Sequence, residues 1–235
     1  MCFSAEASFG VGAVLFPAGG YCAACAVARA PRLLPLALVP IAFGIQQCCE
    51  GMVWIGLQHG EPALVQKWSV LFLFFAVVFW PLWIALSLLI AETRRRQRML
   101  LMFLTALSGV WIWLYYPVAS DPQQWLSTDV AHHSIRYSVG ELPGFQLLPR
   151  VVWRFGYVLA ICVPLILGRV GSGGRGNLTA AALVGALFVA SYVLFWYAFL
   201  SVWCFFAAVV SGLLCIAFHR LPARASNLCP AAVSG

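Results

Sequence analysis

The chain has 235 residues, of which 63% are apolar and only 9% are charged, and its mean hydropathy is +0.93. Soluble domains carry about 25% charged residues, so this composition excludes a soluble protein and predicts an integral membrane protein. The net charge of +7 comes from basic residues that lie mostly between apolar runs. It therefore gives no indication of nucleic-acid binding, and the lipid bilayer is the expected partner.

The apolar runs predict an all-α, polytopic membrane protein with seven transmembrane helices and no separate soluble domain. The expected spans cover residues 3–28, 35–57, 68–91, 100–117, 151–167, 178–197 and 200–218. The first run is interpreted as a retained helix and not as a signal peptide, because its basic residues, Arg29 and Arg32, follow it. The bundle is one domain over residues 1–220, and residues 221–235 form a short polar tail.

The basic residues favour a bundle whose N-terminus lies outside and whose C-terminus lies in the cytoplasm. Seven spans place ten of the 14 basic residues on the inner side: Arg29, Arg32, Arg94, Arg95, Arg96, Arg98, Arg169, Arg175, Arg220 and Arg224. The four on or near the outer side are Lys67, Arg136, Arg150 and Arg154. Basic residues concentrate in cytoplasmic loops, and a six-span arrangement would place part of the inner set outside.

Residues 118–149 are expected to form the one long loop, which emerges on the outer side and contains His132 and His133. A loop of this length in a compact protein is usually functional or disordered. In the third span, Pro81 predicts a kink because proline removes a helical hydrogen bond.

The second span carries polar residues at a spacing that places them on one helix face. At 3.6 residues per turn, this face contains Gln46, Gln47, Glu50 and Trp54. A carboxylate inside a membrane span is costly, so it normally faces the protein interior, a partner or water. Glu50 is therefore the candidate catalytic or proton-binding residue.

Several other polar residues are predicted to lie at the depth of Glu50. The helix rise places Glu50 about 10 Å, Cys204 about 7 Å and Glu6 about 6 Å below the outer ends of their spans. Arg154 follows one turn inside its span, and the histidine loop emerges on the same side. The predicted site in the outer third of the bundle thus draws on Cys2, Glu6, Gln46, Gln47, Glu50, His132, His133, Arg154 and Cys204.

A metal centre is one hypothesis for this site. Removal of Met1 would leave Cys2 with a free amine and a thiol, which together chelate a metal. With Glu50, Cys204 and His132 or His133, they form a mixed nitrogen, sulfur and oxygen set that suits zinc or copper. The hypothesis rests on shared depth, because the sequence has no HExxH and no paired CxxC motif.

Each of these residues also has a structural interpretation. Glu50 could form an ion pair with Arg154 or lie buried as a hydrogen-bonded neutral acid. Cys2 and Cys204 could form a disulfide at the oxidising outer face. The two histidines could be surface residues of the loop.

Four segments carry a resemblance to a known family: Met1-Cys2-Phe3-Ser4-Ala5-x-Ala7-Ser8, Gly44-Ile45-Gln46-Gln47-x-x-Glu50-Gly51-x-x-Trp54, His132-His133-Ser134-Ile135-Arg136-Tyr137 and Ser201-Val202-Trp203-Cys204-Phe205-Phe206-Ala207-Ala208. The whole chain resembles a family of small bacterial membrane proteins that have no known function and begin MCFSA. The resemblance implies a multi-pass protein of the bacterial inner membrane, and it leaves open which histidine is the counterpart in the loop. Its motif positions add Tyr137 and Trp203 to the residues expected around the site.

Three classes of function remain open. The first is a metal-centred redox enzyme or hydrolase, and the second is a transporter or proton pathway that uses Glu50. The third is a ligand-binding or sensory bundle that works with a membrane partner or as a homo-oligomer. Retinal binding is disfavoured, because Lys67 is the only lysine and does not lie mid-helix.

Overall fold

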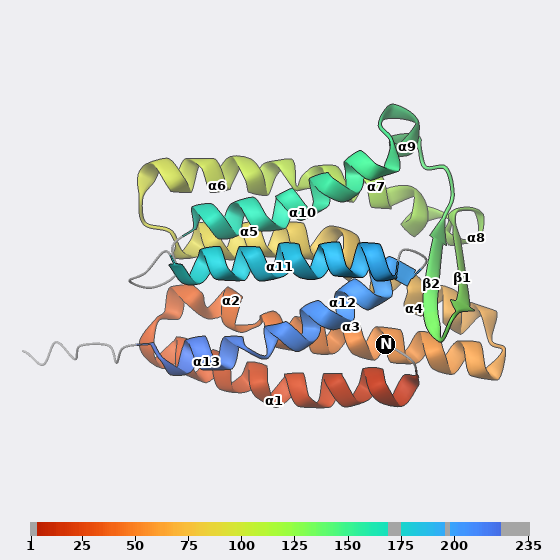
Figure 1. Ribbon diagram of the computed structural model, residues 1–235, viewed down its shortest axis with the longest axis horizontal. Helices are drawn as coiled ribbons and strands as arrows, with labels where there is room; N and C mark the ends of the chain where they lie inside the picture. Colours follow the sequence, from red (N-terminus) through yellow and green to blue (C-terminus); the bar gives the residue numbers. More distant parts are fainter. Residues whose placement is uncertain (1–3, 169–174, 196–197, 222–235) are drawn as a thin grey trace, which may run out of the picture.

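The computed structural model describes residues 4–168, 175–195 and 198–221. Long helices run side by side along its longest axis, and a β-hairpin crosses one end of them (Figure 1). In the first half of the chain the elements are α1 (Ala5–Arg29), η1 (Pro31–Leu33), α2 (Leu34–Ala37), α3 (Val39–His59), α4 (Pro62–Leu73), η2 (Phe74–Phe79), α5 (Trp80–Ala91), α6 (Arg95–Leu107) and α7 (Gly109–Ser120). The second half contains α8 (Pro122–Trp125), β1 (Leu126–Ala131), β2 (Ser134–Val139), α9 (Pro143–Leu147), α10 (Arg150–Leu167), α11 (Arg175–Leu194), α12 (Phe199–Ser211) and α13 (Leu214–His219).

Six helical runs among the described residues are long and apolar enough to cross a membrane: Ala5–Arg29, Pro31–His59, Pro62–Ala91, Arg95–Ser120, Arg150–Leu167 and Phe199–His219. The predicted polytopic helical membrane bundle is thereby confirmed. The apolar helix Leu178–Leu194 is shorter, and it lies where the sequence predicts the sixth of seven spans. The seventh crossing and the orientation stay predictions.

Local signals in the sequence explain where the first helices begin and end. Ser4 caps α1 with its side-chain oxygen, which accepts a hydrogen bond from the Ala7 N–H at 3.3 Å. Gly60 ends α3 in the left-handed region, at φ 66°, which a glycine adopts without steric cost. Pro62 then begins α4, where its missing N–H breaks no helical hydrogen bond.

The third run is helical throughout, and its backbone changes register just before Pro81. The π-helical turn η2, Phe74–Phe79, joins α4 to α5, and Pro81 stands in the first turn of α5. Proline cannot donate to a carbonyl one turn earlier, and a π-turn is one way to accommodate that loss. The sequence predicts an irregularity here, and the structure supplies it as a π-turn.

The tightest packing between the first helices involves small residues. At Gly19 of α1, an added Cβ would stand 2.9 Å from the backbone nitrogen of Ile41 in α3 and closer still to its side chain. Small residues allow helices to approach closely. In a bilayer this close packing drives helix association, because the hydrophobic effect does not act between helices surrounded by lipid. The two helices lie side by side in Figure 1.

Residues 118–149, predicted as a long loop, contain regular structure. Strands β1 and β2 pair antiparallel and are joined by a two-residue turn of His132 and His133, which have φ values of 46° and 60°. Both central residues of a type I′ hairpin turn need positive φ, and glycine or asparagine usually supplies it. The histidine pair therefore gave no turn signal in the sequence.

The hairpin is attached to the bundle by its inward face. Ile135 is fully buried, and Tyr137 stacks on Phe72 with ring centroids 4.8 Å apart. Thr128 donates a hydrogen bond to Ser69 of α4 at 3.0 Å. We refer to this end of the molecule as the hairpin end, and to the opposite end, where Arg94 to Arg98 begin α6, as the arginine end (Figure 1).

We predict that Gly19→Ala destabilises the protein by about 1–3 kcal/mol, because the new methyl group overpacks the contact with Ile41. Thermal unfolding in detergent measures the effect. Gly20→Ala is the matched control, since nothing lies within 4 Å of a Cβ at Gly20. Equal melting temperatures for the two variants would contradict this account of the packing.

A second prediction concerns orientation. Cysteines introduced by His132→Cys and Arg96→Cys are exposed and lie at opposite ends of the bundle. In intact cells, a membrane-impermeant maleimide should label the first variant above the wild-type background and leave the second unlabelled until the cells are lysed. Labelling of Arg96→Cys alone would reverse the predicted topology.

Candidate functional site

Three polar side chains of α3 and one thiol of α12 lie inside the bundle, towards its hairpin end. Gln46, Gln47 and Glu50 are fully buried, and Cys204 is 1% exposed. We call these four residues the buried polar cluster. The helix α12 packs against α3, which brings the thiol to the polar face of the second run.

A hydrogen bond and a charge interaction link Cys204 to two other members of the buried polar cluster. The Cys204 thiol lies beside the Gln46 amide and within electrostatic range of the Glu50 carboxyl group. Trp80 of α5 donates its indole N–H to Gln46 Oε1 at 2.7 Å. The Trp80 ring also stacks on Phe43 at 3.7 Å, so the acceptor side of the Gln46 amide is held firmly.

Several buried polar atoms of this face have no hydrogen-bond partner among the described residues. They are Gln47 Oε1, Gln47 Nε2 and Trp54 Nε1. Each buried polar atom left without a partner costs about 1–3 kcal/mol, so native proteins keep few of them. Three such atoms on one helix face make this region the candidate binding site.

The structure brings Gln46, Glu50 and Cys204 together and places other predicted site residues elsewhere. Glu6 is exposed near the start of α1. His132 and His133 are exposed at the tip of the hairpin. Cys2 lies outside the described residues.

The remaining predicted residues pack around the cluster at a distance. Trp54 is 6% exposed on the same face of α3, two turns beyond Gln47. Trp203, next to Cys204, packs edge-on against Phe188 with centroids 5.6 Å apart. Tyr137 belongs to the hairpin core described above.

Arg154 does not form the ion pair that was considered for Glu50. Its guanidinium lies over the rings of Tyr192, at 5.3 Å, and Phe199, at 6.0 Å. The ion pairs found within the described parts of the chain are Arg136 with Asp129 and Arg150 with Glu141.

The described residues contain no group of three histidine, cysteine, aspartate or glutamate side chains that could hold a metal ion. Glu50 and Cys204 alone offer two ligands, while structural zinc sites use four and catalytic ones three. A zinc or copper centre built on this pair needs a further ligand, and Cys2 is the residue that the sequence suggests.

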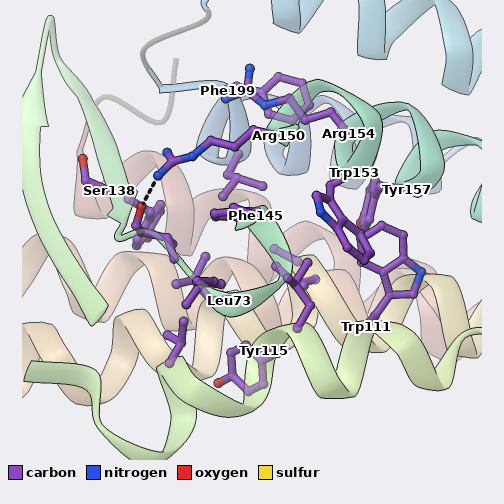
Figure 2. Close-up of a pocket in the computed structure, with 18 of the residues that line it drawn as sticks. Leu73, Trp111, Tyr115, Ser138, Phe145, Arg150, Trp153, Arg154, Tyr157 and Phe199 are labelled. Carbon is purple, nitrogen blue, oxygen red and sulfur yellow. Dashed lines mark hydrogen bonds between the residues drawn. The ribbon is translucent and has the colours of Figure 1, made fainter. Parts of the chain in front are cut away.

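Sequence reasoning missed a cavity at the hairpin end, with a volume of about 450 Å³. Its walls come from α4, η2, α7, β2, α9, α10, α11 and α12, and we call it the hairpin-end cavity. Figure 2 shows Arg150 and Arg154 on one side of it, with Phe199 beside Arg154 and with Trp111, Trp153 and Tyr157 grouped at another side.

Helix α10 contributes four residues of one face to the lining of this cavity. Arg150, Trp153, Arg154 and Tyr157 recur at i, i+3, i+4 and i+7, the spacing of a single helix face. This spacing is visible in the sequence, although of these four residues only Arg154 is among the predicted site residues. Tyr157 also lies near Cys204, so it separates the cavity from the buried polar cluster.

A second cavity, of about 430 Å³, extends from Tyr157 and Cys204 towards the arginine end. Its lining is apolar apart from Tyr157, Thr179, Trp203, Cys204 and Ser211. The Cys204 thiol therefore borders a mainly apolar space on the arginine-end side.

We predict that Trp80→Phe lowers the free energy of unfolding by about 1–2 kcal/mol, because Gln46 Oε1 loses its donor while staying buried. Unfolding in detergent measures the loss, and the exposed Trp113→Phe serves as the control. Combining Trp80→Phe with Gln46→Leu completes a double-mutant cycle. Additive effects in that cycle would show that the two side chains are not coupled.

Comparisons with other proteins give a family and no activity. No curated protein matches the chain, and no solved structure matches it. The family described as "Family of unknown function (DUF6629)" matches residues 1–228, which is nearly the whole chain. The protein therefore belongs to this family, which the opening resemblance to proteins of no known function anticipated.

Proposed function

We propose that the protein is a membrane-embedded binding site for a small polar molecule or metal ion, which Glu50 and Cys204 hold and act on as a redox or hydrolytic centre. The observation that carries the proposal is the fully buried Gln47 amide, whose oxygen and nitrogen both lack a partner among the described residues. An amide in that position supplies a donor and an acceptor to whatever occupies the site.

The energetics favour a ligand over a purely structural role. A structural core gains nothing from an unpaired glutamine, because an apolar residue of similar shape avoids the desolvation penalty. Gln46 differs in this respect, since Trp80 satisfies its oxygen and holds the side chain in place. The hydrogen bond of Gln46 with Trp80 thus fixes the polar face of α3. Gln47 and Trp54 have polar atoms that can bind a ligand.

The chemistry available at the cluster combines an acid and a thiol. A carboxyl group can accept or donate a proton, and a thiolate is a nucleophile and a soft metal ligand. The two groups lie within electrostatic range of each other, so the charge on one affects the other. Such a pair suits a ligand that is hydrolysed, bound through a metal, or reduced by electrons from an external thiol or other donor.

The route to the cluster is proposed to start at the hairpin end, which we place on the outer face of a bacterial inner membrane. Tyr157 lines the hairpin-end cavity and lies near Cys204. Rotation of this single side chain would connect the cavity with the cluster. The arginine-end side offers only the mainly apolar second cavity.

The test compares what copurifies with the protein and its variants. Native mass spectrometry and elemental analysis, on protein purified without chelator, should find a bound small molecule or metal in the wild type. Glu50→Gln and Gln47→Leu should both lose it, because they remove the carboxylate and the amide that hold it. The exposed loop variant Glu61→Gln should retain it.

Stability measurements separate the proposal from a structural role of the same residues. If Gln47 only fills space, Gln47→Leu should raise the melting temperature, because a buried penalty disappears. If Gln47 binds a ligand, the variant loses the stabilisation that the ligand gives to the folded state. A wild type without any bound species, together with a stabilised Gln47→Leu, would refute the proposal.

A further inference from the structure

The hairpin-end cavity has the size and lining of a ligand pocket and lies apart from the buried polar cluster. Its volume of about 450 Å³ falls within the range of small-molecule sites, about 300–1,000 Å³. Aromatic rings form much of its wall, and Trp111 packs edge-on against both Trp153, at 5.9 Å, and Tyr157, at 5.4 Å. Such a wall favours an apolar chain.

Three arginines line the same cavity, and acidic partners compensate two of them. Arg136 pairs with Asp129 across the hairpin, and Arg150 pairs with Glu141 at 2.7 Å. Arg150 also donates to the Val139 carbonyl oxygen at 3.2 Å, the contact drawn in Figure 2. Both guanidinium groups thus have an acidic partner.

Arg154 is the third arginine, and it has no acidic partner in the described parts of the chain. It is half-buried, and its guanidinium lies on the rings of Phe199 and Tyr192. These contacts orient the planar group without neutralising its charge. The cavity wall therefore carries one positive charge in excess, placed next to an apolar space (Figure 2).

Exposed aromatic residues next to the cavity favour a position at the level of the bilayer headgroups. The neighbouring helix α7 exposes Trp113 and Tyr116, which are 47% and 68% exposed, and aromatic residues of this kind mark the membrane–water interface. Trp111 and Tyr115 of the same helix segment line the cavity. An occupant can thus keep a charged group at the interface while its chain lies between the rings.

We propose that the hairpin-end cavity binds a membrane lipid with a phosphate headgroup of net negative charge. Arg154 binds the phosphate, because a guanidinium matches the oxygens of that group with two parallel hydrogen bonds. Trp111, Trp153 and Tyr157 hold the first part of the acyl chain. The lipid site shares Tyr157 with the route proposed to the buried polar cluster, so a bound lipid would occupy that route. Its test does not use the ligand proposed at Glu50, and either proposal can fail without the other.

The test measures lipid binding to delipidated protein in a neutral detergent, by native mass spectrometry. The probes are dioleoylphosphatidylglycerol, dioleoylphosphatidylcholine and inorganic phosphate. We expect the wild type to bind phosphatidylglycerol more tightly than phosphatidylcholine, and to bind inorganic phosphate far more weakly than either. Arg154→Gln should weaken phosphatidylglycerol binding about tenfold or more, the effect of losing a charged hydrogen-bond donor.

Arg98→Gln is the matched control, since Arg98 is exposed at the arginine end. It should bind phosphatidylglycerol like the wild type. Arg154→Lys keeps the charge without the planar fork and should fall between the wild type and Arg154→Gln. Circular dichroism and thermal unfolding establish that each variant is folded, and Arg154→Lys carries the test if Arg154→Gln does not fold.

Three results would overturn the proposal. The first is equal binding of phosphatidylglycerol and phosphatidylcholine by the wild type, which would show that the protein does not recognise the charge of the headgroup. The second is an equal effect of Arg154→Gln and Arg98→Gln, which would place binding away from the cavity. The third is competition by inorganic phosphate at the concentration of the lipid, which would indicate a site for a free anion.

Discussion

The fold depends on the burial of one polar helix face within an apolar medium. No water is present in the hydrocarbon core to satisfy Gln46, Gln47 and Glu50, so these side chains must turn to the protein interior. The run that contains them, Pro31–His59, is 67% buried over its apolar window, whereas the other long runs are 17–44% buried. The second run is therefore the central helix, and the others surround it.

Because of this constraint, the two halves of the bundle differ in the polarity of their interiors. At the hairpin end, the polar face of α3 meets Cys204, Trp80 and, next to the thiol, Tyr157. Towards the arginine end, the described interior is mostly hydrocarbon, including the lining of the second cavity. The buried polar cluster thus lies on the side of the β-hairpin, while the arginine end contains separate buried polar residues such as Ser87 and Glu92.

The sequence predicts the features that depend on the residues of a single helix. Hydropathy alone indicated a polytopic helical bundle, and helical spacing identified the polar face of α3. The adjacency of Glu50 and Cys204 was inferred from depth, yet depth does not state which way a helix is rotated about its axis. That rotation comes from packing, as at the Gly19–Ile41 contact, and one sequence does not reveal it.

Two features escaped prediction for different physical reasons. The β-hairpin has a turn of two histidines in the left-handed region, which residue preferences assign to glycine and asparagine. The hairpin-end cavity is formed jointly by eight helices and strands from distant parts of the sequence, so only its α10 wall left a readable pattern. A binding site between helices is thus less visible in a sequence than a polar stripe on one helix.

The apolar interior at the arginine end bears on which class of function the bundle can serve. A transport path for ions or protons needs polar side chains or water along its whole length. The described lining of the second cavity offers Thr179 and Ser211 beyond Cys204, which is sparse for a polar path. A site that is loaded and emptied from one end fits this asymmetry better. In the function proposed above, Tyr157 would stand between the hairpin-end cavity and the Cys204 thiol.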